Sequence, residues 1–419
     1  MKKFGLFGKI ISLLIVMSLL FSMMLLVGCK KKNNDDDDDD TPAADGGYKN
    51  EKAEEGRADF IAELGGVSDT YKGAVSEQSY DTPETAAVAF VTEEIVGGKD
   101  VSIAAVTPKS KLSTTEIDAL NLPADVKEGI VGVNKLEVTY STSNPSAQGD
   151  AVIAPCAVAS NDTVVIVYVI KYENAWKYYS PAPVTGKTIT KSYYDSVFNY
   201  EKYKNCTLET EMALSMNVVG TDGTETHTID MEVTAKQLIK HADGKVYAEM
   251  YTKTVAKQDG QTQTNEQYIY LYIEDKGDVV DCYVKMSKDG AWLKGSLNMV
   301  GFSDIDELTP FYDQYLDYTY FTKTSFGFAI EEKNAKLYLA EVMSDLEDMF
   351  PGAFSQNDMG IDMYAEYYVA NGVLTGMRSD ASVSFSLSED GITADATEAV
   401  VSSTKVSNYG TTVIDSPVD

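Results

Sequence analysis

Strict alternation of apolar and polar residues constrains the fold of this chain more than any other feature of its sequence. It is clearest in residues 208–218, where polar or small residues separate the apolar ones, and in residues 382–388, where serines separate them. A period of two places the apolar residues on one face of a β-strand. We therefore predict an antiparallel sheet with one covered face and one solvated face.

Turn signals separate the alternating runs of the second half of the chain. Pairs of Asp, Lys or Asn followed by Gly occur at 222–223, 243–244, 259–260, 276–277, 289–290, 371–372 and 390–391. Such pairs favour the tight turns of β-hairpins. Helical spacing over 303–320 and 336–350 interrupts this pattern. We predict a large antiparallel β half-barrel with helical insertions over residues 187–419.

Residues 57–186 have a different pattern, with helix starts followed by strands. Thr82-Pro83-Glu84 supplies an N-cap, a first-turn proline and an acid near the positive end of a helix over 86–96. The spacing of Ser113 and Glu116 is that of a capping box. Strands are predicted over 135–141, 150–159, 163–172 and 176–179. We predict an α+β chain, with this helix-plus-curved-sheet domain preceding the half-barrel.

The first 28 residues have the order of a secretory leader. Lys2, Lys3 and Lys9 form a positive start, and residues 10–27 are almost wholly apolar. The leader ends in Leu26-Val27-Gly28-Cys29, which resembles the lipobox of bacterial lipoproteins. This resemblance implies cleavage between Gly28 and Cys29 and a diacylglyceryl group on Cys29. Two acyl chains give a stable attachment where one gives a marginal attachment.

Residues 29–56 are predicted to be a disordered, charged tether. They include a run of six aspartates at 35–40 and few large apolar residues. Removal of the leader takes away three lysines and leaves 65 acidic against 32 basic side chains, a formal charge of −33. So acidic a chain is repelled by nucleic acids and anionic lipid headgroups. We expect no nucleic-acid partner, and a location on the extracytoplasmic face of the cell membrane through lipid on Cys29.

Two regions resemble known folds. The helix starts above, with Gly97-Gly98-Lys99-Asp100, are similar to the NTF2-like superfamily. The hairpins and the closing run of residues 406–417 resemble the LolA/LppX group of lipoprotein carriers, and this resemblance implies a bent half-barrel around an apolar cavity. The predicted lining is Met212, Leu214, Met216, Val218, Ile229, Met231, Val233, Val280, Val284, Val383, Phe385 and Leu387. The alternative is that these side chains form an ordinary, filled core.

No catalytic motif is present. His227 and His241 have no metal-ligand spacing with each other or with a cysteine, and we expect both on the surface. Cys156, Cys206 and Cys282 are too few for a disulfide framework, although a bridge between Cys206 and Cys282 remains open. We expect no cofactor, no metal site and no enzymatic activity.

The sequence supports two alternative functions for this chain. The first is a membrane-anchored extracytoplasmic lipoprotein that binds an apolar ligand, a lipid or an acyl chain, in the half-barrel. The second is a non-catalytic structural or interaction lipoprotein, whose 27 tyrosines would meet a protein or polysaccharide partner at the cell surface.

Overall fold

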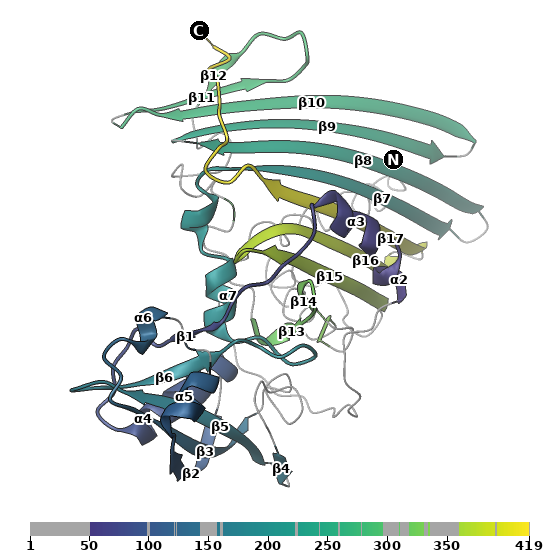
Figure 1. Ribbon diagram of the computed structural model, residues 1–419. Coiled ribbons are helices and arrows are strands. Elements are labelled where there is room, and N and C mark those ends of the chain that lie inside the picture. Colours follow the sequence, from purple (N-terminus) through teal and green to yellow (C-terminus); the bar gives the residue numbers. More distant parts are fainter. Residues whose placement is uncertain are drawn as a thin grey trace.

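The computed structural model describes residues 51–98, 101–120, 122, 124–142, 157–159, 162–222, 225–242, 244–258, 260–277, 279–295, 310, 318–330, 334–335, 360–389 and 392–418. Two antiparallel sheets dominate these residues (Figure 1). The smaller sheet has six strands and the larger has eleven. Gly28 and Cys29, and the helical insertion predicted at 336–350, lie outside the described residues.

The smaller sheet has the strand order β1-β6-β5-β3-β2, with β4 paired to β5. The helices α4, α5 and α6 and the π-helix η1 accompany it. Its elements are β1 (Gly73–Val75), α4 (Pro83–Ala89), η1 (Phe90–Ile95), β2 (Val101–Lys111), α5 (Thr114–Ala119), α6 (Ala124–Lys127), β3 (Gly132–Thr142), β4 (Ala157–Ala159), β5 (Asp162–Lys171) and β6 (Trp176–Pro181).

Both predicted helix starts of this region are confirmed. The Thr82 side chain accepts a hydrogen bond from the Thr85 backbone at 3.1 Å, with Pro83 at the start of α4. The Ser113 side chain accepts from the Glu116 backbone, and the Glu116 carboxylate accepts from the Ser113 backbone at 2.7 Å. The apolar side of α4 and η1 packs against β3, β5 and β6, so the local caps position the helix that covers this sheet.

The larger sheet is open, and its strand order is β12-β11-β10-β9-β8-β7-β17-β16-β15-β14-β13. Its strands are β7 (Cys206–Asp222), β8 (Glu225–Ala242), β9 (Lys245–Gln258), β10 (Gln261–Asp275), β11 (Val280–Lys285), β12 (Leu293–Gly295), β13 (Phe321–Lys323), β14 (Gly327–Ile330), β15 (Gly360–Ala370), β16 (Val373–Glu389) and β17 (Ile392–Ser407). The long strands β7 to β10 curve together in Figure 1.

The predicted hairpins of this sheet are present. The strand pairs β7–β8, β8–β9, β9–β10, β15–β16 and β16–β17 each join through a predicted turn. At the β15–β16 turn, Asn371 and Gly372 have φ of 53° and 73°. Two positive φ values are what a type I′ hairpin turn requires, and Asn-Gly provides them at low cost.

The predicted α+β class is wrong, because the chain is mostly β. The helices α2 to α7 are four to seven residues long, whereas the longest strand of the large sheet has 18 residues. They include α2 (Glu51–Glu54), α3 (Arg57–Glu63) and α7 (Lys191–Val197), and a 3-10 turn, η4 (Tyr200–Tyr203), follows α7. The aromatic run 193–204 does not form one continuous helix, because the chain leaves the helical conformation at Phe198, where ψ is 22°.

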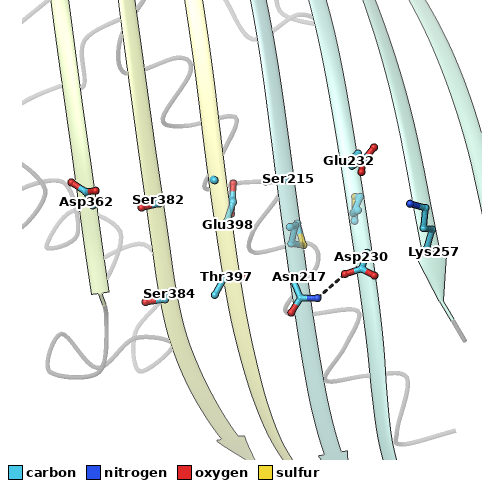
Figure 2. Close-up of a pocket in the computed structure, with 13 residues that line it drawn as sticks. Ser215, Asn217, Asp230, Glu232, Lys257, Asp362, Ser382, Ser384, Thr397 and Glu398 are labelled. Carbon is cyan, nitrogen blue, oxygen red and sulfur yellow. Dashed lines mark hydrogen bonds between the residues drawn. The ribbon is translucent and has the colours of Figure 1, made fainter. Parts of the chain in front are cut away.

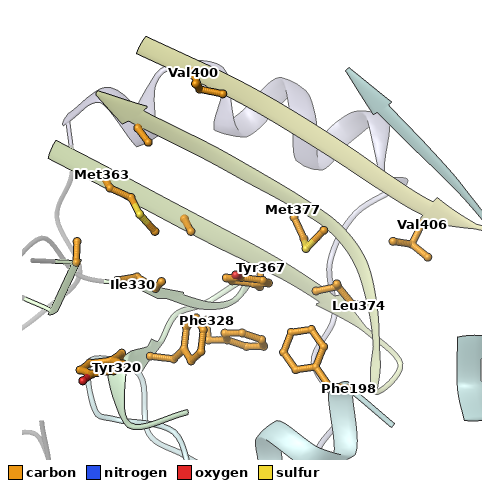
Figure 3. Packing of buried hydrophobic residues seen from close by; sticks show 14 of the residues in the cluster. Phe198, Tyr320, Phe328, Ile330, Met363, Tyr367, Leu374, Met377, Val400 and Val406 are labelled. Atoms are coloured by element: carbon orange, nitrogen blue, oxygen red, sulfur yellow. The ribbon is translucent and has the colours of Figure 1, made fainter. Parts of the chain in front are cut away.

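Helix α7 and the turn after it lie against one face of the large sheet. Phe198 packs edge-on against Phe328 of β14 and Tyr367 of β15, and these two rings stack with centroids 4.8 Å apart (Figure 3). The same cluster includes Met363 and Met377. These contacts give the large sheet an aromatic core at the end nearest the small sheet.

Candidate functional site

The two faces of the large sheet differ in chemistry throughout its central strands. We define the apolar face as the one that carries Leu214 and Met216 of β7, and the polar face as the one that carries Ser215 and Asn217. Residues opposite each other on paired antiparallel strands share a face. The strand register therefore assigns side chains of neighbouring strands to one face or the other.

The register brings seven of the predicted cavity residues together on the apolar face. Leu214 pairs with Val233, Met216 with Met231, and Val218 with Ile229, and Met212 precedes them on β7. These residues belong to one cluster with the aromatic core. The described side chains of Met216 and Met231 are buried and that of Met212 is half-buried.

Val280 and Val284 lie on β11, four strands away from β7. They pack in a second cluster with Val246, Ile273 and Cys282, and Ile239 of β8 contacts both clusters. Val383, Phe385 and Leu387 alternate along β16, as predicted, but their side chains lie outside the described part of the structure. The apolar face therefore extends continuously from β16 to β11.

The apolar face is less covered at its β11–β12 edge than at its centre. Leu293 of β12 pairs with Val284 and shares its face, yet Leu293 is 64% exposed. Met286 follows β11 directly, continues the alternation of Val284, and is also 64% exposed. Val280, Val284 and Leu271 are half-buried. Aliphatic side chains at this edge are therefore available to an apolar molecule in solution.

Sequence reasoning missed a buried acid on the same face. Glu398 of β17 pairs with Met216 on one side and Val383 on the other, and it is 4% exposed. The sequence pattern that could have revealed it is alternation: Glu398 lies two residues from Ala396 and from Val400, which are buried on the same face. A carboxylate among methionine and aliphatic side chains changes the chemistry of this face from purely apolar to mixed.

A groove of about 760 Å³ lies on the opposite, polar face (Figure 2). Side chains of six neighbouring strands, from β15 to β9, contribute to it. The polar-face residues that line it are Ser215, Asn217, Asp230, Glu232, Lys257, Asp362, Ser382, Ser384, Thr397 and Ala399. Met216, Met231 and Glu398, whose side chains the register assigns to the apolar face, also border it. The Asn217 amide donates a 2.6 Å hydrogen bond to the Asp230 carboxylate in its floor.

The expectation of two surface histidines is wrong for His241. This residue lies in β8 between Cys206 and Val246, and it is 3% exposed. Burial lowers the pKa of His241 to about 3, so its imidazole is neutral at physiological pH. His227 lies near the start of β8 and is half-buried.

The two described cysteines are free thiols. Cys206 lies on β7 and Cys282 on β11, with three strands between them. Strands are about 4.8 Å apart, so this separation is too great for a disulfide. Burial raises the pKa of the Cys206 and Cys282 thiols. Cys156 lies outside the described residues.

Within the described ranges, no group of three or more His, Cys, Asp or Glu side chains is placed to hold a metal ion. The helices of these ranges also include none with the length and apolar character needed to cross a membrane.

Comparisons with known proteins assign no family. No family model matches the chain, and no curated protein matches it. A solved structure of a DUF1329 family protein from Desulfovibrio piger is 12% identical and covers 55% of this chain and 96% of its own, with a TM-score of 0.17. The outer membrane protein opdK from Pseudomonas aeruginosa is 8% identical and covers 66% of this chain and 88% of its own, with a TM-score of 0.12. Likenesses this weak assign neither a fold family nor a function.

Proposed function

We propose that this chain is an extracytoplasmic lipoprotein that is anchored through Cys29 and binds an apolar ligand, a lipid or an acyl chain, on the apolar face of its large sheet. The anchor is supported by the lipobox-like ending of the leader, Leu26-Val27-Gly28-Cys29. The proposed role is binding without a chemical step.

The exposed aliphatic edge of the apolar face is the observation that carries this proposal. Most of the apolar face is buried, but Leu293 and Met286 remain 64% exposed beside half-buried Val284. Burying apolar surface is worth about 25 cal/mol per Å², so a flexible chain that lies along this edge gains most of its affinity from contact with such residues. The resemblance of the hairpins and of the closing run 406–417 to the LolA/LppX group supports the same use of this face.

The arrangement of the apolar side chains supports a position for this ligand. Ile239 connects the β11 edge to the central cluster with Met216 and Met231. Methionine side chains adapt their shape readily, so they can make room for an acyl chain that enters from the edge. Glu398, which lies on the same face, can accept hydrogen bonds from the hydroxyl groups in the head of a monoacylglycerol or a similar amphiphile.

A fluorescent fatty acid, cis-parinaric acid, tests this proposal. The protein would be the chain without residues 1–29, which keeps every described element. We expect saturable binding that falls about tenfold when Met286 and Leu293 are both changed to serine, because each loses apolar contact area. Val401→Ser is the matched control, since Val401 is 47% exposed but lies on the polar face, opposite Ala213 of β7. Absence of saturable binding, or equal affinity in both variants, would contradict the proposal.

A further inference from the structure

We propose that the groove on the polar face is a second, separate binding site, for a neutral oligosaccharide chain that lies across the strands. This site is on the other side of the sheet from the apolar ligand, so it extends the proposed function. Its support is the arrangement, the chemistry and the charge of the groove residues.

The register arranges the groove residues in two rows that cross the strands. In the first row Glu232, Ser215, Ala399, Ser382 and Asp362 follow one another from β8 to β15. In the second row Lys257, Asp230, Asn217, Thr397 and Ser384 follow one another from β9 to β16. Adjacent strands are about 4.8 Å apart, so each row of five positions spans about 20 Å. A ligand that follows the rows is therefore elongated and runs perpendicular to the strands.

The side chains differ between the middle and the ends of the rows. In the first row the positions on β7, β17 and β16 are short: Ser215, Ala399 and Ser382. In the second row Asn217 is longer, and Thr397 and Ser384 are short. Longer charged groups begin both rows, with Glu232 on β8 and Lys257 on β9, and Asp362 on β15 ends the first row. Short residues between longer ones leave a hollow floor that lets a ligand approach the sheet closely.

The chemistry of the lining fits a ligand rich in hydroxyl groups. Serine and threonine hydroxyls donate and accept hydrogen bonds, and carboxylates accept them from ligand hydroxyls. The Asn217 amide holds the Asp230 carboxylate in position through its 2.6 Å hydrogen bond. Sugar hydroxyls spaced along a chain can pair with groups that recur at every strand of a row.

The charge of the groove indicates that the oligosaccharide is neutral. The lining residues include four acids, Asp230, Glu232, Asp362 and Glu398, against a single cation, Lys257. The whole chain is also strongly acidic, with 65 acidic against 35 basic side chains. A polyanion such as polygalacturonate is repelled by both the local and the overall charge.

A peptide fits the groove less well than a sugar chain. Extended peptides usually pair with the exposed edge of a sheet, where backbone groups are available, whereas these rows lie on a sheet face between paired strands. Protein partners also depend on large side chains in well-packed apolar pockets. The polar-face lining includes no aromatic side chain, and its one aliphatic member is Ala399.

Binding to immobilised polysaccharides tests this proposal with the full lipoprotein in a polyoxyethylene detergent, which contains no sugar. The neutral probes are xylan, mannan, β-1,3-glucan, dextran and chitin oligomers, and the charged probes are polygalacturonate and oligolysine. We expect at least one neutral probe to bind. Ser215→Tyr should weaken this binding about tenfold, because the ring fills the floor of the groove.

Thr234→Tyr is the matched control for this variant. Thr234 and Ser215 are both exposed on the polar face, but Thr234 lies on β8 outside the groove lining. Both variants should bind cis-parinaric acid as the unchanged protein does, which separates this site from the apolar face. The proposal is overturned if no neutral probe binds, if Ser215→Tyr and Thr234→Tyr bind equally, or if a charged probe binds most tightly.

Discussion

Arg57 of α3 donates two hydrogen bonds, from Nε at 2.8 Å and from Nη2 at 2.5 Å, to one carboxylate oxygen of Glu366, a residue 309 positions later in the chain. Glu366 lies on β15 and its side chain is completely buried. The neighbouring Phe60 packs edge-on against Tyr368, and Arg378 donates to the carbonyl oxygens of Ala53 and Glu55. The first described helices therefore belong to the large sheet, on its polar side.

This docking has a consequence for the proposed anchor. A tether that starts at Cys29 would join the protein body through α2 and α3, and so beside the polar face of the large sheet (Figure 1). The small sheet would then extend away from this attachment. The Lys405 ion pair with Glu63 at the end of α3 adds a further contact between the segment and β17.

Replacing Glu366 by Gln should destabilise the large sheet strongly. The change leaves Arg57 facing a neutral amide at a buried site, while Arg378, 3.6 Å from the carboxylate, loses its charge partner. Breaking a buried ion pair typically costs about 3 kcal/mol or more. Urea unfolding measures the loss. The control is Glu211→Gln, because the Glu211–Lys236 pair is 67% exposed at both side chains and should contribute little. Equal losses of unfolding free energy in the two variants would show that the buried Glu366 ion pair stabilises the sheet no more than an exposed pair does.

Glu94 should couple the two sheets. It is 2% exposed, and it accepts hydrogen bonds from Tyr178 and Ser180 of β6 and from the backbone and side chain of Ser192 in α7. Glu94→Ala leaves several buried donors without an acceptor, at a cost of about 1–3 kcal/mol for each such group. We expect calorimetry to show two separated unfolding transitions in place of one. A single transition at an unchanged temperature would contradict this coupling role.

His241 should make the stability depend on pH in acid. Burial lowers its native pKa to about 3, against about 6.5 in an unfolded chain. Between these values the unfolded chain binds one more proton than the native chain, so the free energy of unfolding falls as the pH falls from 6.5 towards 3. At pH 3 the loss in the free energy of unfolding is on the order of 4 kcal/mol. In His241→Phe the titrating group is absent, so its free energy of unfolding should fall less over this range. If the free energy of unfolding of both proteins fell equally with pH over this range, the titration of His241 would not be the cause.

Local signals predicted the hairpins and the helix starts well. Asn371-Gly372 specifies a hairpin turn through its positive φ values. Thr82 and Ser113 specify the starts of two helices through side-chain caps. Each of these features depends on neighbours within four residues. Strand β2 was missed, because most of its side chains are exposed and Pro108 lies at an irregularity of its pairing with β3. Such an edge strand has no clear alternation to detect.

Features that depend on distant pairing could not be read from the sequence. The burial of Glu94 and Glu366 follows from partners about 100 and 300 positions away, respectively, and His241 is buried because β8 lies between β7 and β9. The polar groove likewise depends on the register of six strands. The apolar residues of β7 and β8 could be predicted as one group, because the alternation of each strand fixes which side chains share a face.

Cys29 should determine the location of the protein in its cell. If the lipobox-like ending is processed, the unchanged protein will partition into the detergent phase of Triton X-114 and incorporate radiolabelled palmitate. Cys29→Ser removes the thiol that would carry the diacylglyceryl group, so this variant should lose the label. Cys156→Ser is the control, since Cys156 lies far from the leader. Retention of the palmitate label in Cys29→Ser would contradict the anchor.

Native mass spectrometry of the protein purified from its own host tests whether the large sheet carries an apolar ligand. The spectrum of the released protein body would be compared before and after extraction with organic solvent, alongside the Met286→Ser/Leu293→Ser variant. We expect a stoichiometric added mass of lipid size that extraction removes and that the variant carries at lower occupancy. A bare polypeptide mass in the unextracted protein, with no uptake of added fatty acid or phospholipid, would contradict an apolar ligand on the large sheet.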